Sequence, residues 1–155
     1  KKIIVTLVIA VSSFSTAFAG NSFGKHAAAK GEEVSAKVLD VFQKEFTTAK
    51  DITWTIASNY FQATFMYNDQ YVSAYYSIDG DLMGLTRYIS PADLPLVLQS
   101  DLKKNYSEFW ITDLFEVAKD DGTAYYITLE DADQKIVLKA TGGKRWENYK
   151  KVKKA

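Results

Sequence analysis

The sequence predicts an α+β fold of two tandem units, each with a helix packed on a four-stranded antiparallel sheet. Each half begins with apolar residues at helical spacing and continues with four runs in which apolar and polar residues alternate, separated by turn residues. The two halves also match in the order and spacing of these runs, at an offset of roughly 60 to 64 residues, which is typical of an internal repeat. We therefore expect a first helix-plus-sheet unit over residues 32–90 and a second over residues 91–155.

The chain begins with a segment unlike the rest. Two lysines precede a short apolar run over residues 3–11, and residues 17–19 read AFA, the A-x-A form of a cleavage site. This order is typical of a secretory signal peptide over residues 1–19. The alternative, a membrane anchor, would need about 20 apolar residues. Residues 20–31 then read as a flexible lead-in. We expect a periplasmic or secreted protein with no membrane span after cleavage.

The first unit follows this lead-in. Four apolar residues spaced for one helix face predict a helix from about Glu32 to Glu45. They are Val34, Val38, Val41 and Phe42. Glutamates in the first turn suit the positive end of the helix dipole. Alternating apolar and polar residues then predict four strands, over residues 52–57, 60–67, 71–78 and 81–89. Short turns join these strands, so they should form an antiparallel meander.

The second unit follows a break at Ser90-Pro91. The apolar residues that predict its helix are Leu94, Leu98, Leu102 and Tyr106. Pro95 belongs in the first turn of this helix, because an interior proline would break it. The predicted strands cover residues 113–119, 123–130, 135–141 and 144–152.

Composition favours a packed globular protein and excludes several kinds of site. Of 155 residues, 47% are hydrophobic and 14% aromatic, and none is a cysteine. The chain therefore has no disulfide, thiolate metal site or cysteine nucleophile. Without the two lysines of the signal peptide, 17 basic residues face 19 acidic ones, a net charge of −2. This balance does not favour nucleic-acid binding. The basic C-terminal stretch reads as a solvated strand end or, alternatively, as a patch for an anionic surface.

The sequence offers little for catalysis. Its one histidine, His26, lies in the lead-in, where no predicted element holds it against a nucleophile. We expect no catalytic residue, no enzyme activity, no metal ligand set and no cofactor.

Acidic residues cluster at predicted turns. These clusters are Asp79 with Asp81, Asp120 with Asp121, and the group Glu130, Asp131 and Asp133. Each could be a cation-binding loop, but calcium loops need more oxygen ligands at defined spacing. Turn geometry explains the clusters as well, because aspartate bonds to its own main chain. Asp79-Gly80 in particular is typical of a hairpin turn.

Tyrosines on the predicted strands are the candidate binding residues. Tyr71 and Tyr75 share one strand face, opposite Val72, Ala74 and Tyr76. If the second set faces the helix, the first set lines an open sheet surface, where tyrosine is a favoured interface residue. Ordinary cross-strand pairing within the sheet is the competing explanation. On matching strands of the second unit, we predict Tyr125 and Trp146 as further members of this surface.

The order of several segments carries a family resemblance. FQKEFTTAKDITW, AYYSIDGDL, ISPADLP and LKKNYSEFWITDLFEV follow one another along the chain. Over about residues 32–150, this order resembles the β-lactamase-inhibitor-like, PepSY-like family of exported bacterial proteins. The resemblance implies tandem α+β units like those of the β-lactamase inhibitory protein (BLIP), and an exported protein of a Gram-negative bacterium of the Bacteroidetes kind. It supplies no catalytic or binding residue, because fold alone does not carry function.

Two functional hypotheses follow. The first is an exported, non-enzymatic, PepSY-like binding protein that presents its sheet surface to an unidentified protein or peptide, in a narrower version as an inhibitor of a hydrolase. The alternative is a periplasmic module that binds a small molecule or a cation through its acidic loops.

Overall fold

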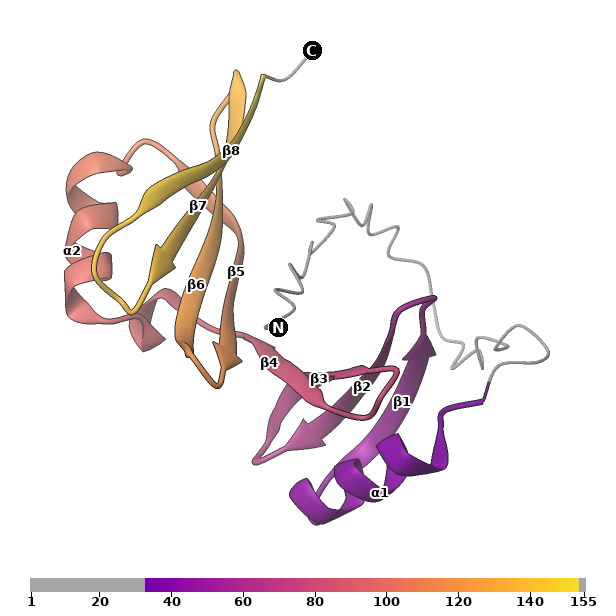
Figure 1. The fold of residues 1–155 in the computed structure, drawn as a ribbon. Helices are drawn as coiled ribbons and strands as arrows, with labels where there is room; N and C mark the ends of the chain where they lie inside the picture. Colours follow the sequence, from indigo (N-terminus) through magenta and orange to yellow (C-terminus); the bar gives the residue numbers. More distant parts are fainter. Residues whose placement is uncertain (1–32, 154–155) are drawn as a thin grey trace, which may run out of the picture.

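The computed structural model describes residues 33–153, in which eight strands form one antiparallel sheet in the order β1 to β8 (Figure 1). The signal peptide predicted over residues 1–19, the lead-in over 20–31 and His26 lie outside the described residues.

The sequence pattern located the elements well. The helices are α1 (Ala36–Glu45) and α2 (Leu96–Asn105), with a short 3-10 helix at Pro91–Asp93. The strands of the first half are β1 (Lys50–Ile56), β2 (Tyr60–Tyr67), β3 (Gln70–Ser77) and β4 (Leu82–Tyr88). The strands of the second half are β5 (Trp110–Lys119), β6 (Gly122–Glu130), β7 (Gln134–Thr141) and β8 (Glu147–Lys153).

The prediction of two tandem units, each a helix packed on its own four-stranded sheet, is wrong. β4 pairs antiparallel with β5, with Leu85 opposite Ala118 and Tyr88 opposite Phe115, so one sheet runs through both halves. Alternation of apolar and polar residues shows which face of a strand is buried, but it does not show which strand lies beside it. An unpaired edge strand presents a row of backbone donors and acceptors without hydrogen bonds. On the outer edge of β4 these groups pair with the backbone of β5.

Both helices cover the same face of this sheet. Val38 and Phe42 of α1 pack on a buried cluster that the first half supplies, including Ala63, Phe65, Ala74 and Tyr76. Leu98 of α2 packs on a second cluster, including Leu114, Ile127, Leu129 and Leu138. The side chains of Leu85, Ala118 and Leu114 share one face, because register and alternation place them there. We call this side the helix face and the opposite side the open face.

The ends of α1 show why it is shorter than expected. Ser35 has extended backbone geometry, and its Oγ accepts a hydrogen bond from the Val38 N–H at 3.3 Å. Serine is a favoured N-cap, so the helix begins at Ala36 and not at Glu32. At the other end, the Phe46 N–H donates to the Phe42 carbonyl at 2.9 Å, which closes the last turn near the predicted Glu45.

The entry to α2 begins at Ser90, where the sequence predicts a break. The Ser90 N–H and hydroxyl both donate to Asp93 Oδ2, at 2.8 and 2.7 Å. Pro95 occupies the N-cap position of α2, one residue before the first turn in which it was predicted, and its carbonyl accepts hydrogen bonds from the Leu98 and Gln99 N–H groups. The chain passes from β4 to α2 through these residues.

Candidate binding surface

Six aromatic side chains cross the open face from β2 to β8. This aromatic row consists of Tyr60, Tyr75, Tyr88, Phe115, Tyr126 and Tyr149. The Tyr60 and Tyr75 ring centroids lie 5.9 Å apart, and those of Tyr88 and Phe115 lie 6.3 Å apart. Phe115 stacks on Tyr126 at 5.2 Å, with an interplanar angle of 7°. Tyr126 meets Tyr149 edge to face at 5.4 Å.

Strand register builds the central part of this row. Phe115 lies directly opposite Tyr88 on β4 and directly opposite Tyr126 on β6. Side chains that face each other across antiparallel strands are close enough for ring contacts. Lys139, opposite Tyr126 on β7, places its Nζ 5.5 Å from the centroid of the Tyr126 ring. The row therefore depends on the β4–β5 pairing that joins the two halves.

The row is accessible where the two halves meet. Tyr88 is 75% exposed, although its ring touches Phe115. Tyr149 at the far edge and Tyr71 on β3 are also exposed. A large aromatic ring that remains in water at the centre of a sheet face is the kind of residue that anchors protein interfaces.

Two tyrosines of this row, Tyr75 and Tyr88, have a pKa above the ordinary value of the side chain. Desolvation raises the pKa of Tyr75 above its ordinary value, against a hydrogen bond with Thr86 that lowers it. Desolvation also raises the pKa of Tyr88, with smaller contributions from Asp113 and Tyr75. Both hydroxyls are therefore neutral near pH 7 and can donate a hydrogen bond to a partner.

Beside the row, the open face of the first half is polar. Gln62 Nε2 donates to Thr64 Oγ1 at 3.3 Å and to Ser73 Oγ at 3.2 Å, and the two hydroxyls lie 2.9 Å apart. This network fixes three side chains between the ring of Tyr75 and the exposed Tyr71, so the first half offers polar groups beside its rings.

The structure brings together two of the four residues predicted for this surface. Tyr71 and Tyr75 lie on the open face of β3, while their neighbours Ala74 and Tyr76 point to the other face and pack with α1. Tyr125 and Trp146 do not, because they lie on the helix face: Tyr125 packs against the second core cluster, and Trp146 is only 7% exposed. The indole Nε1 of Trp146 donates to the Leu98 carbonyl of α2 at 3.1 Å.

The wrong placement has a clear physical reason. Tyr125 alternates with Ile127 and Leu129, which are buried under α2, so its neighbour Tyr126 takes the open face. The alternation of apolar residues along β6 was therefore enough to predict that Tyr125 faces the helix and Tyr126 the open side. Alternation gives no comparable signal for Tyr88, Phe115 and Tyr149, which were not predicted as members of the surface. Their contacts need the β4–β5 pairing and a register shift between β7 and β8.

The acidic clusters behave as turns. Asp131 Oδ1 accepts hydrogen bonds from the N–H groups of Asp133 and Gln134, both at 2.8 Å. In the β3–β4 turn, the Gly80 N–H donates to the Ser77 carbonyl at 3.0 Å, and Gly80 has a φ of 90°. Among residues 33–153, no three acidic or histidine side chains gather in a way that could hold a metal ion.

Comparisons with known proteins show the fold. No family model and no curated protein matches the chain. A BLIP-like protein from Bacteroides fragilis superimposes with a TM-score of 0.71 at 16% identity, covering 81% of this chain and 92% of that one. A DUF2874 family protein from Bacteroides ovatus gives 0.69 at 16% identity, covering 79% and 89%. A Bacteroides eggerthii protein, itself only proposed to be periplasmic, gives 0.67 at 14% identity, covering 79% and 90%.

These likenesses establish a BLIP-like fold, which the resemblance in the sequence implied. Membership of the PepSY-like family stays a prediction, because no family model matches. In the described part of the chain, neither helix has the length and apolar character needed to cross a membrane.

Proposed function

We propose that this protein is an exported, non-enzymatic binding module whose open sheet face contacts a protein or peptide. The observation that carries the proposal is the aromatic row, which continues across the β4–β5 junction and leaves Tyr88 largely exposed. A surface that merely closes a sheet would bury such a ring under neighbouring side chains.

The chemistry of the open face suits a protein partner. Tyrosine and phenylalanine give a large contact area at low entropic cost, and the tyrosine hydroxyls can hydrogen-bond at the rim. The polar network of Gln62, Thr64 and Ser73 next to the row would form the more hydrated part of such an interface. Neither helix lies over these groups, since both pack on the opposite face.

Export and a non-enzymatic role complete the proposal. Export rests on the predicted signal peptide, and the similarity to a protein proposed to be periplasmic supports it. The narrower version, inhibition of a hydrolase, is suggested by the likeness to a BLIP-like protein. Because fold alone does not carry function, the experiment below has to decide it.

Site-directed photocross-linking tests this proposal. A photoreactive phenylalanine derivative replaces Tyr88 on the open face or, as the matched control, the exposed Val97 on α2. We expect a discrete cross-linked partner from position 88 and none from position 97. With that partner purified, Tyr88→Ala should weaken binding by at least about tenfold, as expected for an interface anchor.

Two outcomes would contradict the proposal. One is a partner that cross-links only through position 97. The other is an affinity that Tyr88→Ala leaves unchanged while the variant remains folded. If the captured partner is a hydrolase, its activity in the presence of the wild-type protein and of Tyr88→Ala decides the narrower version.

A further inference from the structure

A pocket lies on the helix face where the two halves of the sheet meet. Its volume is about 340 Å³, within the range of sites that hold small ligands. It is on the opposite side from the aromatic row, so it is independent of the function proposed above. Its walls come from the end of α1, from the β2–β3 turn and from β3, β4 and β5.

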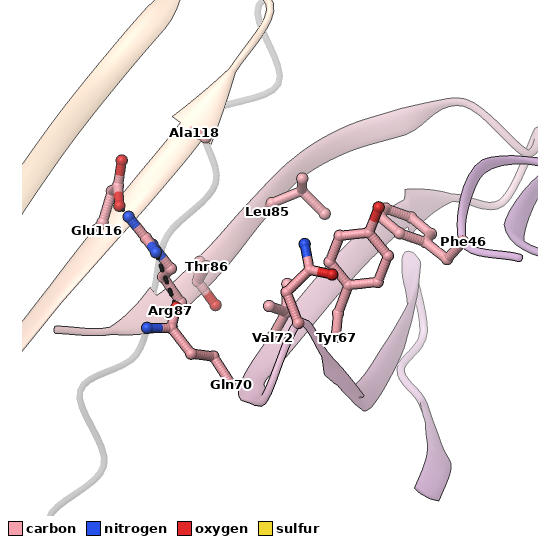
Figure 2. Close-up of a pocket in the computed structure, with 10 residues that line it drawn as sticks. Phe46, Tyr67, Gln70, Val72, Leu85, Thr86, Arg87, Glu116 and Ala118 are labelled. Atoms are coloured by element: carbon pink, nitrogen blue, oxygen red, sulfur yellow. Dashed lines mark hydrogen bonds and ion pairs between the residues drawn. The ribbon is translucent and has the colours of Figure 1, made fainter. Parts of the chain in front are cut away.

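One end of the pocket is apolar. Phe46 and Tyr67 meet edge to face at 5.6 Å, and Val72, Leu85 and Ala118 add aliphatic side chains to the lining. Asn68, next to Tyr67 in the chain, also lines the pocket. Figure 2 shows Phe46 and Tyr67 at one end of the group and Arg87 with Glu116 at the other. An apolar ligand tail would find most of its contacts at the aromatic end.

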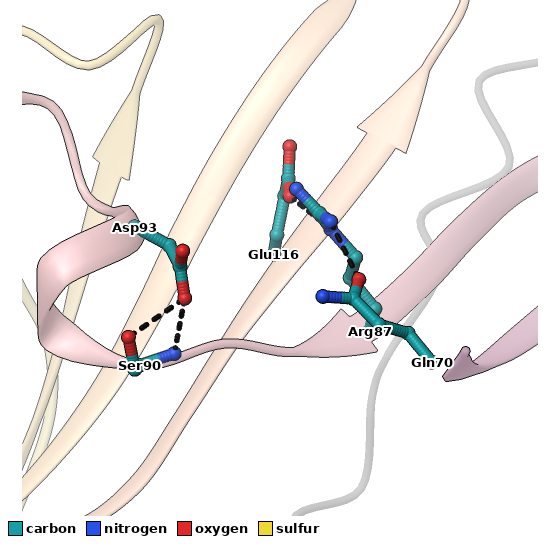
Figure 3. A network of polar contacts seen from close by, with 5 residues as sticks. All are labelled: Gln70, Arg87, Ser90, Asp93 and Glu116. Atoms are coloured by element: carbon teal, nitrogen blue, oxygen red, sulfur yellow. Dashed lines mark hydrogen bonds and ion pairs between the residues drawn. The ribbon is translucent and has the colours of Figure 1, made fainter. Parts of the chain in front are cut away.

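The other end carries a guanidinium group held in a fixed position. Arg87 Nε donates to Glu116 Oε2 at 2.7 Å, and Arg87 Nη1 donates to Gln70 Oε1 at 2.8 Å (Figure 3). The Glu116 side chain is only 17% exposed, so its carboxylate needs this partner. The two bonds orient the guanidinium before any ligand arrives, which lowers the entropic cost of binding.

Arg87 has donors to spare. A guanidinium carries five N–H groups, and among residues 33–153 Arg87 uses two of them, which leaves three. The side chain is 42% exposed, so a ligand can reach it. Because paired N–H groups of arginine match the two oxygens of a carboxylate, the preferred ligand group is a carboxylate.

We propose that this pocket binds an apolar carboxylate, with the acid on Arg87 and the apolar tail against Phe46, Tyr67 and Leu85. Two sources share this chemistry: a small aromatic or aliphatic acid, and the C-terminal residue of a peptide with an apolar side chain.

The test uses the full mature chain and defined probes. We expect 3-phenylpropionate to bind with a dissociation constant of about 1 mM or tighter, a realistic affinity for so small a ligand. In an NMR titration, the backbone amide resonances that shift should belong to pocket-lining residues such as Val72, Leu85 and Ala118. The uncharged amide of the same acid should bind at least about tenfold more weakly, because it loses the charge-assisted bonds.

Variants separate the two parts of the site. Arg87→Met removes the donors and should weaken binding of the acid at least about tenfold, whereas Arg145→Met, at an exposed arginine outside the pocket, should have no effect. Ala118→Leu adds volume to the lining while Arg87 stays unmutated, and it should also abolish binding, so the test survives if Arg87→Met folds poorly. Circular dichroism checks the fold of each variant.

A peptide arm distinguishes the sources. A short peptide that ends in phenylalanine is compared with its C-terminal amide and with the free acid. Tighter binding of the peptide acid than of 3-phenylpropionate identifies a peptide C-terminus, and the reverse identifies a small acid.

The proposal is overturned if the acid and its amide bind equally well or if the shifted resonances lie outside the pocket. Unchanged affinity in a folded Ala118→Leu variant, or no response up to about 10 mM probe, would overturn it as well.

Discussion

The two halves of the sheet have the same order of elements but different chemistry in their cores. Under α1 the buried cluster contains Phe42, Phe65 and Tyr76, with the Phe42 and Phe65 ring centroids 4.9 Å apart. Among residues 33–153, the buried cluster under α2 is mainly leucine and isoleucine with one aromatic residue, Trp146, while Tyr106, Phe109 and Tyr125 pack against it from positions that are only partly buried. A helix on a sheet therefore tolerates different apolar sets, provided that volume and pattern are kept.

The open faces differ as well. Each half supplies three of the six rings of the aromatic row. In the first half the Gln62, Thr64 and Ser73 network lies beside the rings, whereas in the second half Phe115, Tyr126 and Tyr149 contact one another in sequence. Val117 and Val137 are also buried on this face of the second half. A partner of this face would therefore meet polar groups beside the rings on the first half and a continuous run of rings on the second.

Matched core substitutions probe the comparison most strongly. Phe65→Ala should cost about 3–5 kcal/mol and Leu138→Ala about 2–5 kcal/mol of unfolding free energy, because each removes a fully buried side chain. Urea denaturation measures both. Leu96→Ala, at the 80% exposed Leu96 of α2, is the control and should stay within about 0.5 kcal/mol of the wild type. A clearly smaller loss for Phe65→Ala would mean that the rings of the first half close over the cavity.

The turn glycines of the two halves give the next largest effect. Gly80 has a φ of 90°, and an added Cβ would lie 3.0 Å from the Lys37 side chain. Gly142 has a φ of 62° and open space around its Cα. Gly80→Ala should therefore cost about 1–2 kcal/mol and Gly142→Ala about 1 kcal/mol. Thermal unfolding of the two variants checks the order, and equal losses would show that Lys37 simply moves aside.

Alkaline pH should affect the first half through Tyr76. This tyrosine is fully buried, and its hydroxyl donates to Glu45 Oε2 at 3.3 Å. Burial, and then the Glu45 carboxylate, raise the pKa of Tyr76. The folded state holds this proton more tightly than the unfolded state, whose tyrosine pKa is about 10. The resulting stability is present below about pH 10 and is lost as the pH rises further.

Tyr76→Phe tests this dependence. The variant should lose about 1 kcal/mol at pH 7, where it lacks the hydrogen bond, and its stability should fall less steeply than that of the wild type above about pH 10. Trp146→Phe in the second half removes an indole that does not titrate, so the unfolding free energy that it costs should be the same at pH 7 and above about pH 10. Urea midpoints at the two pH values measure the difference. Parallel pH profiles for wild type and Tyr76→Phe would refute the assignment.

The smallest expected effect is at Asp113, beside the exposed Tyr88. Partial burial raises the pKa of Asp113 above its ordinary value. The charged form is therefore disfavoured in the folded state, and the stability linked to Asp113 is present at acid pH and lost as the pH rises through its folded pKa. Asp113→Asn should stabilise the protein at pH 7 by up to about 1 kcal/mol. The exposed Asp120→Asn is the control, and destabilisation by Asp113→Asn would contradict this explanation.

Elements and sites differ in how far the sequence could predict them. Helical spacing up to Phe42 and alternation through β2 and β3 depend on neighbours a few residues away. β2 and β3 lie within one residue of the predicted bounds, and α1 ends at the predicted Glu45 but begins four residues later than expected, at Ala36. The side of Tyr71 and Tyr75 also follows from alternation within one strand. Tyr125 and Trp146 were misplaced because matching the two halves by order does not preserve which face each side chain takes.

Composition and local periodicity are enough to predict the helices, the strands, the turns between them and the absence of cysteine chemistry. The pairing of β4 with β5, which joins the halves into one sheet, is visible only in the folded chain. That pairing puts Tyr88 against Phe115 on one face and Arg87 against Glu116 on the other. Both pairs connect residues far apart in the chain through strand register, and a local pattern contains no information about which strand lies alongside.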